Sequence, residues 1–96
     1  MYILVVKTSS LGDIIHALPG LTDLQRYYPN TEIHWVAEKS FADVPSWHPS
    51  VKRVIPVALR RWRKQPFSAQ TRQEWRAFKK ELRSFPYDLV IDAQGL

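Results

Sequence analysis

A short apolar run, followed at once by a polar loop and a helical pattern, is the feature that most constrains how this sequence can fold. The run, residues 2–6, is rich in β-branched residues and predicts a strand buried on both faces of a parallel sheet. Apolar residues then recur at helical spacing from about Asp13 to Tyr28, with Pro19 predicting a kink or a second start. The loop between them, residues 7–13, would lie at the carboxyl end of the strand, where ligands bind in open α/β sheets.

The same alternation of strands and helices continues along the chain. Further strands are predicted at 32–36, 51–57 and 89–92, and Pro56 indicates an edge position or the end of its strand. Helix starts of the hydroxyl-to-carboxylate type are predicted at Ser40 and Thr71, the second opening a helix to about Ser84. One α/β domain with a parallel sheet is therefore expected. Because no helix follows the last strand to cover it, we expect the chain to be a piece of a longer protein.

Asp13 has two interpretations. Ser10 and Asp13 match the pattern in which a hydroxyl caps a helix start and a carboxylate reaches back, and spacing alone favours this interpretation. In the alternative, Gly12 lets the backbone approach a ligand closely while Asp13 acts as a general base. His16, three residues further on, lies on roughly the same helix face and could either hydrogen-bond near this site or be purely structural.

The net charge of +5 conceals an uneven distribution of charge. Residues 52–83 hold eleven Lys and Arg against Glu74 and Glu81, a net of +9, and the rest of the chain sums to −4. Such a field attracts polyanions, which include nucleic acid, an anionic membrane and a phosphorylated substrate. Residues 60–64 follow a predicted strand and should share the sheet edge of the 7–13 loop, whereas the cations of the last helix are expected to form a solvated surface.

Several classes of site are not supported. The chain has no cysteine, and its three glycines form neither a dinucleotide-binding nor a P-loop motif. Its three histidines share no metal-ligand spacing, so neither a cofactor nor a metal is expected. Asp92 and Gly95 alone resemble the magnesium-binding turn of GTPases, without the loop that would hold phosphates. With no export signal or long apolar span, we expect a soluble cytoplasmic protein.

Several motifs together resemble the N-terminal part of the lipopolysaccharide heptosyltransferases, glycosyltransferase family 9. Gly-Asp followed by His-x-Leu-Pro is shared by the wider family, whereas Arg-Arg-Trp-Arg-Lys points to the member that adds the first heptose. The similarity extends over nearly the whole chain and is carried by residues 7–19, 47–48, 53–57, 60–64, 88 and 90–95.

This resemblance implies a Rossmann-like sheet belonging to a two-domain enzyme of the GT-B architecture. Residues 1–96 would be part of the N-terminal acceptor-binding domain, with the nucleotide-sugar domain absent, so the chain alone should be inactive. The complete enzyme would transfer L-glycero-D-manno-heptose from ADP-heptose to Kdo of Kdo2-lipid A with inversion, at the cytoplasmic face of the inner membrane and in peripheral contact with its anionic lipids. The resemblance assigns the base to Asp13. The residues expected to bind the acceptor are Thr8, Ser9, Ser10, Gly12, Arg60, Arg61, Arg63 and Lys64.

Two alternatives remain open. The basic region with its Trp and Phe residues could belong to a nucleic-acid-binding module, although no RNA-recognition or helix-turn-helix signature accompanies it, and no specific nucleic acid is expected. A later heptosyltransferase, with a heptose acceptor, is the other alternative, against which the segment 60–64 argues. Trp62 could lie on sugar or lipid, or be a buried anchor for its loop.

Overall fold

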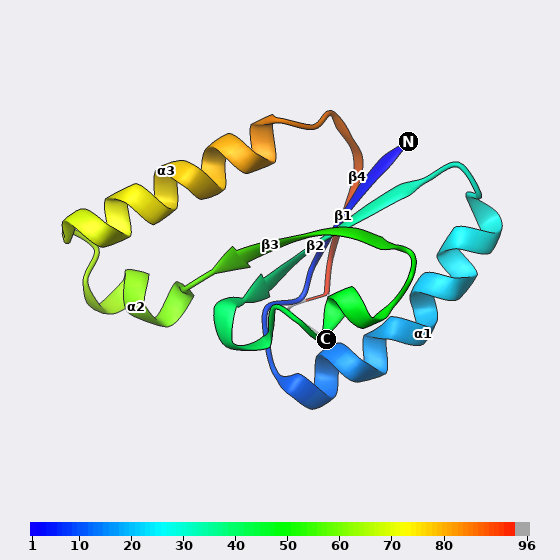
Figure 1. Ribbon diagram of the computed structural model, residues 1–96, viewed down its shortest axis with the longest axis horizontal. Helices are drawn as coiled ribbons and strands as arrows, with labels where there is room; N and C mark the ends of the chain where they lie inside the picture. Colours follow the sequence, from blue (N-terminus) through cyan, green and yellow to red (C-terminus); the bar gives the residue numbers. More distant parts are fainter. Residues whose placement is uncertain (94–96) are drawn as a thin grey trace.

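A computed structural model describes residues 1–93 of the chain, which form a parallel sheet with helices on both faces (Figure 1). The strands are β1 (Tyr2–Val6), β2 (Glu32–Glu38), β3 (Val51–Val57) and β4 (Tyr87–Asp92). The α-helices are α1 (Leu11–Tyr27), α2 (Leu59–Lys64) and α3 (Ala69–Arg83), and two short 3₁₀ turns are η1 (Lys39–Phe41) and η2 (Pro45–Trp47). The predicted α/β class with a parallel sheet is thus confirmed. The resemblance at residues 94 and 95, including Gly95 of the magnesium-type turn, lies outside the described residues.

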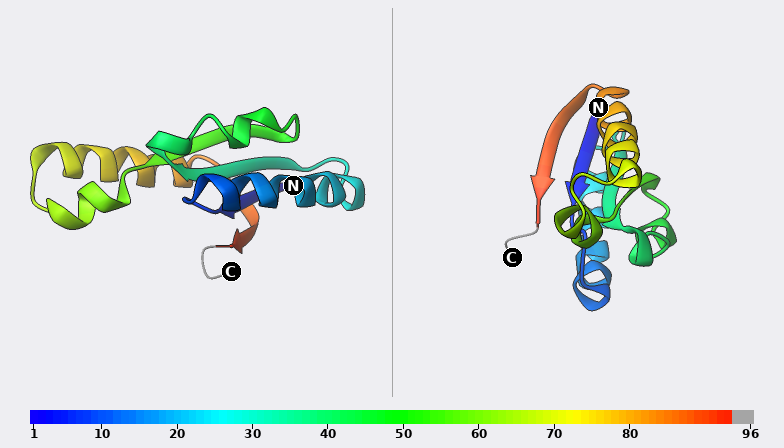
Figure 2. Two further views of the ribbon diagram at one scale, coloured as in Figure 1. Left: turned by 90° about the horizontal axis from the view of Figure 1, so that it is seen from below. Right: turned by 90° about the vertical axis from the view of Figure 1, so that its left-hand side faces the viewer.

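The strand order is β3-β2-β1-β4, with all neighbours parallel. The central strand β1 is buried, as its apolar sequence predicts, and β3 lies at an edge, which explains how Pro56 is tolerated within it. The other edge, β4, remains uncovered: Leu89 is 44% exposed and Val90 is 56% exposed. Figure 2 shows β4 standing apart from the helices at its side of the sheet. The expectation that the last strand lacks a covering helix is therefore confirmed within residues 1–93.

Two apolar clusters hold the helices on opposite faces of the sheet. Ile14 and Leu21 of α1 pack against the face that carries Ile3, Ile33 and Trp35. On the other face, residues of β1, β2 and β3 contact α2 and α3, through Leu4, Val36, Ile55, Val57, Trp62, Phe78 and Leu82. Alternate residues of the central strands thus supply both clusters, as the period of a strand requires.

The helix starts differ from the sequence-based predictions. Helix α3 begins at Ala69, and its N-cap is Ser68, whose hydroxyl accepts a hydrogen bond from the Thr71 N–H at 3.1 Å. The predicted capping by Thr71 is therefore wrong, because an earlier hydroxyl takes that position. The predicted start at Ser40 is also wrong, since η1 begins one residue earlier without a side-chain cap.

Helix α1 begins at Leu11, two residues before the start that the apolar spacing predicts, and Ser10 occupies the N-cap position that the Ser10–Asp13 pattern predicts. The helix continues through Pro19 as a single helix. A second start at Pro19 is therefore not found. Strand β2 extends two residues beyond its predicted end, and β4 begins two residues before its predicted start. Among the described residues, no helix is both long and apolar enough to cross a bilayer.

Candidate functional site

A cleft of about 970 Å³ opens at the carboxyl edge of the sheet. Three segments line it, each following a strand: the loop after β1, the turn η1 after β2, and α2 after β3. Its lining includes Thr8, Ser9, Lys39, Arg60, Arg61, Arg63 and Lys64. The expectation that residues 60–64 share a sheet edge with the 7–13 loop is thus confirmed.

The loop after β1 is held in place by bonds to β2. The Trp35 indole donates a hydrogen bond to the Lys7 carbonyl at 2.9 Å, and the Glu38 N–H donates one to the Thr8 carbonyl at 3.0 Å. Lys7 and Thr8 are buried, whereas Ser9 is exposed. The loop therefore enters the cleft on a backbone fixed by its neighbouring strand.

Helix α2 is anchored by Trp62, which projects away from solvent between the sheet and α3. The residue is 9% exposed, and its ring lies 5.7 Å from the Trp75 ring and 5.9 Å from that of Phe78, centroid to centroid. At the start of α2, the Leu59 N–H donates a hydrogen bond to the Glu38 carboxylate at 3.1 Å. Of the two interpretations of Trp62, the structure supports the buried anchor, and three neighbouring cations are left exposed at the cleft: Arg60, Arg63 and Lys64.

Glu74 of α3 joins three parts of the site. Its carboxylate accepts hydrogen bonds from Lys39 at 2.7 Å, from Arg61, and from the Trp62 indole at 3.1 Å. The Lys39 and Arg61 contacts hold the pKa of Glu74 well below its ordinary value of 4.5, at about 2. Arg61 is therefore partly neutralised, and it differs in this respect from the other cations of α2.

We expect Glu74→Gln to destabilise the complete protein by about 1–2 kcal/mol at pH 7, because two cations lose their carboxylate. Since the pKa is lowered in the folded state, this contribution is full above about pH 5 and disappears as the pH falls toward 2. In urea unfolding followed by tryptophan fluorescence, the free energies of unfolding of the variant and the wild type should therefore become equal as the pH falls over this range.

Glu81→Gln is the matched control for Glu74→Gln. Glu81 lies on the same helix and pairs with Arg53, whose side chain is 44% exposed, so its loss should cost less than about 1 kcal/mol. If the difference in the free energy of unfolding between Glu74→Gln and the wild type stayed constant from pH 7 to about pH 3, the assigned ion pairs would be contradicted.

Asp13 lies in the first turn of α1. Its Oδ2 accepts a hydrogen bond from the Ser10 hydroxyl at 3.2 Å and lies 3.9 Å from Nζ of Lys7. The Ser10 side chain makes no cap bond to the helix, so the predicted capping box is not formed, and the Asp13 side chain is 61% exposed. The carboxylate is thus held near the carboxyl end of β1 while remaining accessible to a ligand.

The structure does not bring every predicted site residue into the cleft. Ser10, Gly12 and Asp13 continue the loop into α1 and are not among the described residues that line it. A Cβ added at Gly12 would meet nothing within 4 Å, so the space beside this backbone is open. His16 is exposed and makes no hydrogen bond to Asp13, and residues 1–93 hold no group of three or more His, Cys, Asp or Glu that could bind a metal.

Comparison with curated proteins gives a match over all 96 residues. The chain is 58% identical to lipopolysaccharide heptosyltransferase 1 of Pseudomonas aeruginosa and 56% identical to that of Escherichia coli K12. All 96 residues of this chain thus match lipopolysaccharide heptosyltransferase 1. The chain spans 27% and 30%, respectively, of these two relatives. No family model matches.

Solved heptosyltransferase structures share the fold. The E. coli heptosyltransferase WaaC with ADP superimposes with a TM-score of 0.93, and WaaC with ADP-2-deoxy-2-fluoro heptose with 0.92, each over 100% of this chain and 30% of the other. A glycosyl transferase family 9 structure from Veillonella parvula, 21% identical, gives a TM-score of 0.75 over 97% of this chain and 26% of the other, and supports the fold alone. The resemblance to the heptosyltransferases is therefore confirmed.

Sequence reasoning missed the roles of four residues in or beside the cleft. Lys7 was treated only as part of the loop, and Glu74 only as a charge and as part of a capping pattern, although each pairs with a predicted site residue. Glu38 and Lys39 end β2 and begin η1 at the same sheet edge. The sequence did carry a signal for Glu38 and Lys39. The carboxyl ends of parallel strands meet at one edge of the sheet, so the residues that follow β2 had to lie beside the loops that follow β1 and β3.

Proposed function

We propose that the protein to which this chain belongs is an inverting heptosyltransferase of lipopolysaccharide inner-core synthesis. It would move L-glycero-D-manno-heptose from ADP-heptose to Kdo of Kdo2-lipid A. The observation that carries this proposal is the match over all 96 residues to heptosyltransferase 1 sequences, which extends to WaaC structures with ADP and an ADP-heptose analogue. Because the chain spans about 30% of these relatives, the activity is proposed for the complete protein.

We infer that the cleft holds the anionic part of the acceptor. Kdo carboxylates and lipid A phosphates are clustered anions, and guanidinium groups bind such oxygens in bidentate fashion. Arg60, Arg63 and Lys64 are exposed at the cleft and available for this role. Arg61 shares its charge with Glu74, so we assign it mainly to holding α2 in place. Thr8, Ser9, Ser10 and Gly12 would border the sugar to be glycosylated.

Asp13 is our candidate for the base. A carboxylate is a far weaker base than a sugar alkoxide, so it would take the acceptor hydroxyl proton as that oxygen attacks the anomeric carbon and ADP departs from the opposite face. The Ser10 hydroxyl and the Lys7 ammonium would orient the Asp13 carboxylate, and the open space beside Gly12 would admit the acceptor.

We place residues 1–96 in the acceptor-binding domain of a two-domain GT-B enzyme. The departing diphosphate would be stabilised by helix N-termini and basic side chains of the second domain, which lies outside this chain. The 96 residues alone would therefore be inactive. Because the acceptor is a membrane lipid, we also propose that the enzyme works at the cytoplasmic face of the inner membrane, in peripheral contact with it.

Product analysis with two acceptors tests this function. The complete protein, supplied with ADP-heptose, should add one heptose to deacylated Kdo-lipid A and should use an acceptor that already carries a heptose much less. A preference for the heptosylated acceptor would indicate a later heptosyltransferase. No transfer to either acceptor would contradict the proposal.

A further inference from the structure

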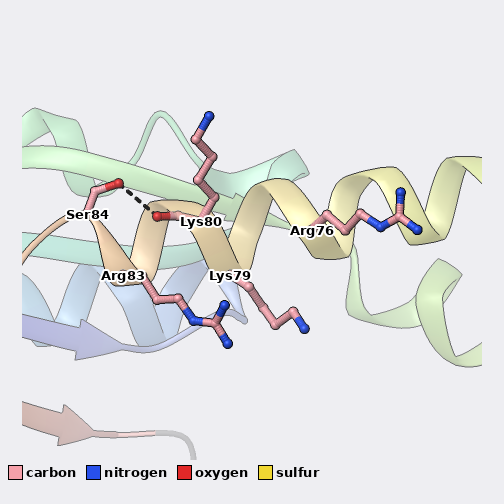
Figure 3. A pocket seen from close by; sticks show the side chains of 5 residues that line it. All are labelled: Arg76, Lys79, Lys80, Arg83 and Ser84. Atoms are coloured by element: carbon pink, nitrogen blue, oxygen red, sulfur yellow. Dashed lines mark hydrogen bonds between the residues drawn. The ribbon is translucent and has the colours of Figure 1, made fainter.

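The outer face of α3 carries an open groove, and four of the five residues that line it are cations. Arg76, Lys79, Lys80 and Arg83, together with Ser84, surround a volume of about 460 Å³. Figure 3 shows these basic side chains extending from α3 into solvent, while the Ser84 hydroxyl donates a hydrogen bond to the Lys80 carbonyl at 2.8 Å. The spacing of three and four residues places the cations on one side of the helix.

The carboxylates of α3 leave these cations unbalanced. Glu74 is bound by Lys39 and Arg61, and Glu81 by Arg53, all of them outside α3. Within residues 1–93, none of the four cations in the groove forms an ion pair. The outer face is therefore a continuous positive surface and not one of mixed sign.

Exposed aromatic rings accompany this positive surface. The Trp75 side chain is 45% exposed, and Nζ of Lys79 lies 5.9 Å from the centre of its ring. Phe67, just before α3, is 83% exposed, and its carbonyl accepts a hydrogen bond from Arg72 at 2.9 Å. The apolar face of α3 packs on the sheet, so the helix would meet a membrane through its cations, which anionic lipids attract, and through exposed rings such as Trp75, which are favoured at the level of the lipid headgroups.

We propose that the outer face of α3, formed by its four groove cations with Trp75 and the preceding Phe67, is the surface that docks on the anionic lipid bilayer. The inference rests on the proposed function, whose acceptor is a membrane lipid, and it assigns membrane contact to a surface other than the acceptor cleft. The four cations can pair with lipid phosphates while their charged groups stay in water at the headgroup level. Burying the same cations without partners against another protein domain would be costly. Docking through α3 would hold the cleft beside the layer that supplies its substrate.

Vesicle partitioning of the complete protein tests this surface. Lys80→Gln with Arg83→Gln removes two cations while keeping good helix formers. The matched control, Arg26→Gln with Lys52→Gln, removes two exposed cations outside α3. Each cation near an anionic surface raises the membrane partition coefficient about fivefold. The α3 variant should therefore partition about 25-fold less into phosphatidylcholine vesicles containing phosphatidylglycerol. The control should lose less than about threefold, because its cations lie outside the docking face.

The outcomes distinguish a failure of the proposed docking surface from a failure of the proposed transferase activity. Wild-type protein that prefers anionic to pure phosphatidylcholine vesicles, with the loss confined to the α3 variant, supports the proposal. Equal losses in both variants, or no preference for anionic vesicles, would overturn it. Tighter retention of an oligonucleotide than of vesicles at physiological salt would also overturn it, in favour of nucleic acid. Transfer to deacylated acceptor should be the same in all three proteins, and its absence in the wild type would instead refute the proposed function.

Discussion

Asp13→Asn in the complete protein is expected to lower kcat for heptose transfer by at least about 100-fold, with little change in either KM. Asparagine has nearly the same shape and can still accept the hydrogen bond from the Ser10 hydroxyl, but it cannot take the proton of the attacking hydroxyl. The rate of acceptor-dependent ADP release measures the effect. The loss should appear in kcat because the proton is transferred in the transition state and not on binding.

Asp23→Asn is the matched control for this substitution. Asp23 is also an exposed aspartate on α1, about three turns further along the helix, and its replacement should leave kcat within about twofold. If Asp13→Asn retained wild-type kcat, the carboxylate would be no base, and its contacts with Ser10 and Lys7 would serve only the start of α1.

Arg63→Ala is expected to raise the acceptor KM by roughly 10- to 100-fold, the typical worth of a charge-assisted hydrogen bond to a substrate anion. The donor KM should change by less than about twofold, because ADP-heptose would be bound by the other domain. Arg63 is exposed and makes no ion pair within residues 1–93, so its removal should leave α2 anchored by Trp62. Initial rates with each substrate varied in turn give both constants.

Arg26→Ala provides the comparison for Arg63→Ala. It removes the same charge from the last turn of α1, outside the cleft, and should leave both KM values near wild type. Equal increases in the acceptor and donor KM of Arg63→Ala would contradict a specific role in acceptor binding.

The strands were the most predictable part of the fold. Residues 51–57 were predicted with the bounds that β3 has, and the buried centre of β1 follows from its run of β-branched residues. Helix starts were less predictable because an N-cap hydroxyl need not be followed by an acid three residues later. Before α3 that pattern occurs at Thr71 and Glu74 and predicted the start there, whereas the N-cap is Ser68, whose third following residue is Thr71.

The candidate site was predictable in its position and unpredictable in its internal contacts. Parallel strands carry their loops to one edge, and this alone brings Thr8 and Ser9 together with the four cations of α2. The link from Glu74 to Arg61 depends on how α3 packs over α2, which local sequence patterns do not encode. The same is true of the positive face of α3, since its net charge becomes exposed only when Glu74 and Glu81 face away from it.

The most direct test of the account is ADP release by the complete wild-type protein with ADP-heptose, in the presence and in the absence of deacylated Kdo-lipid A. The account predicts that ADP appears only with the acceptor and in equal amount to a product one heptose heavier. No acceptor-dependent ADP release, or release without a heptosylated product, would contradict it.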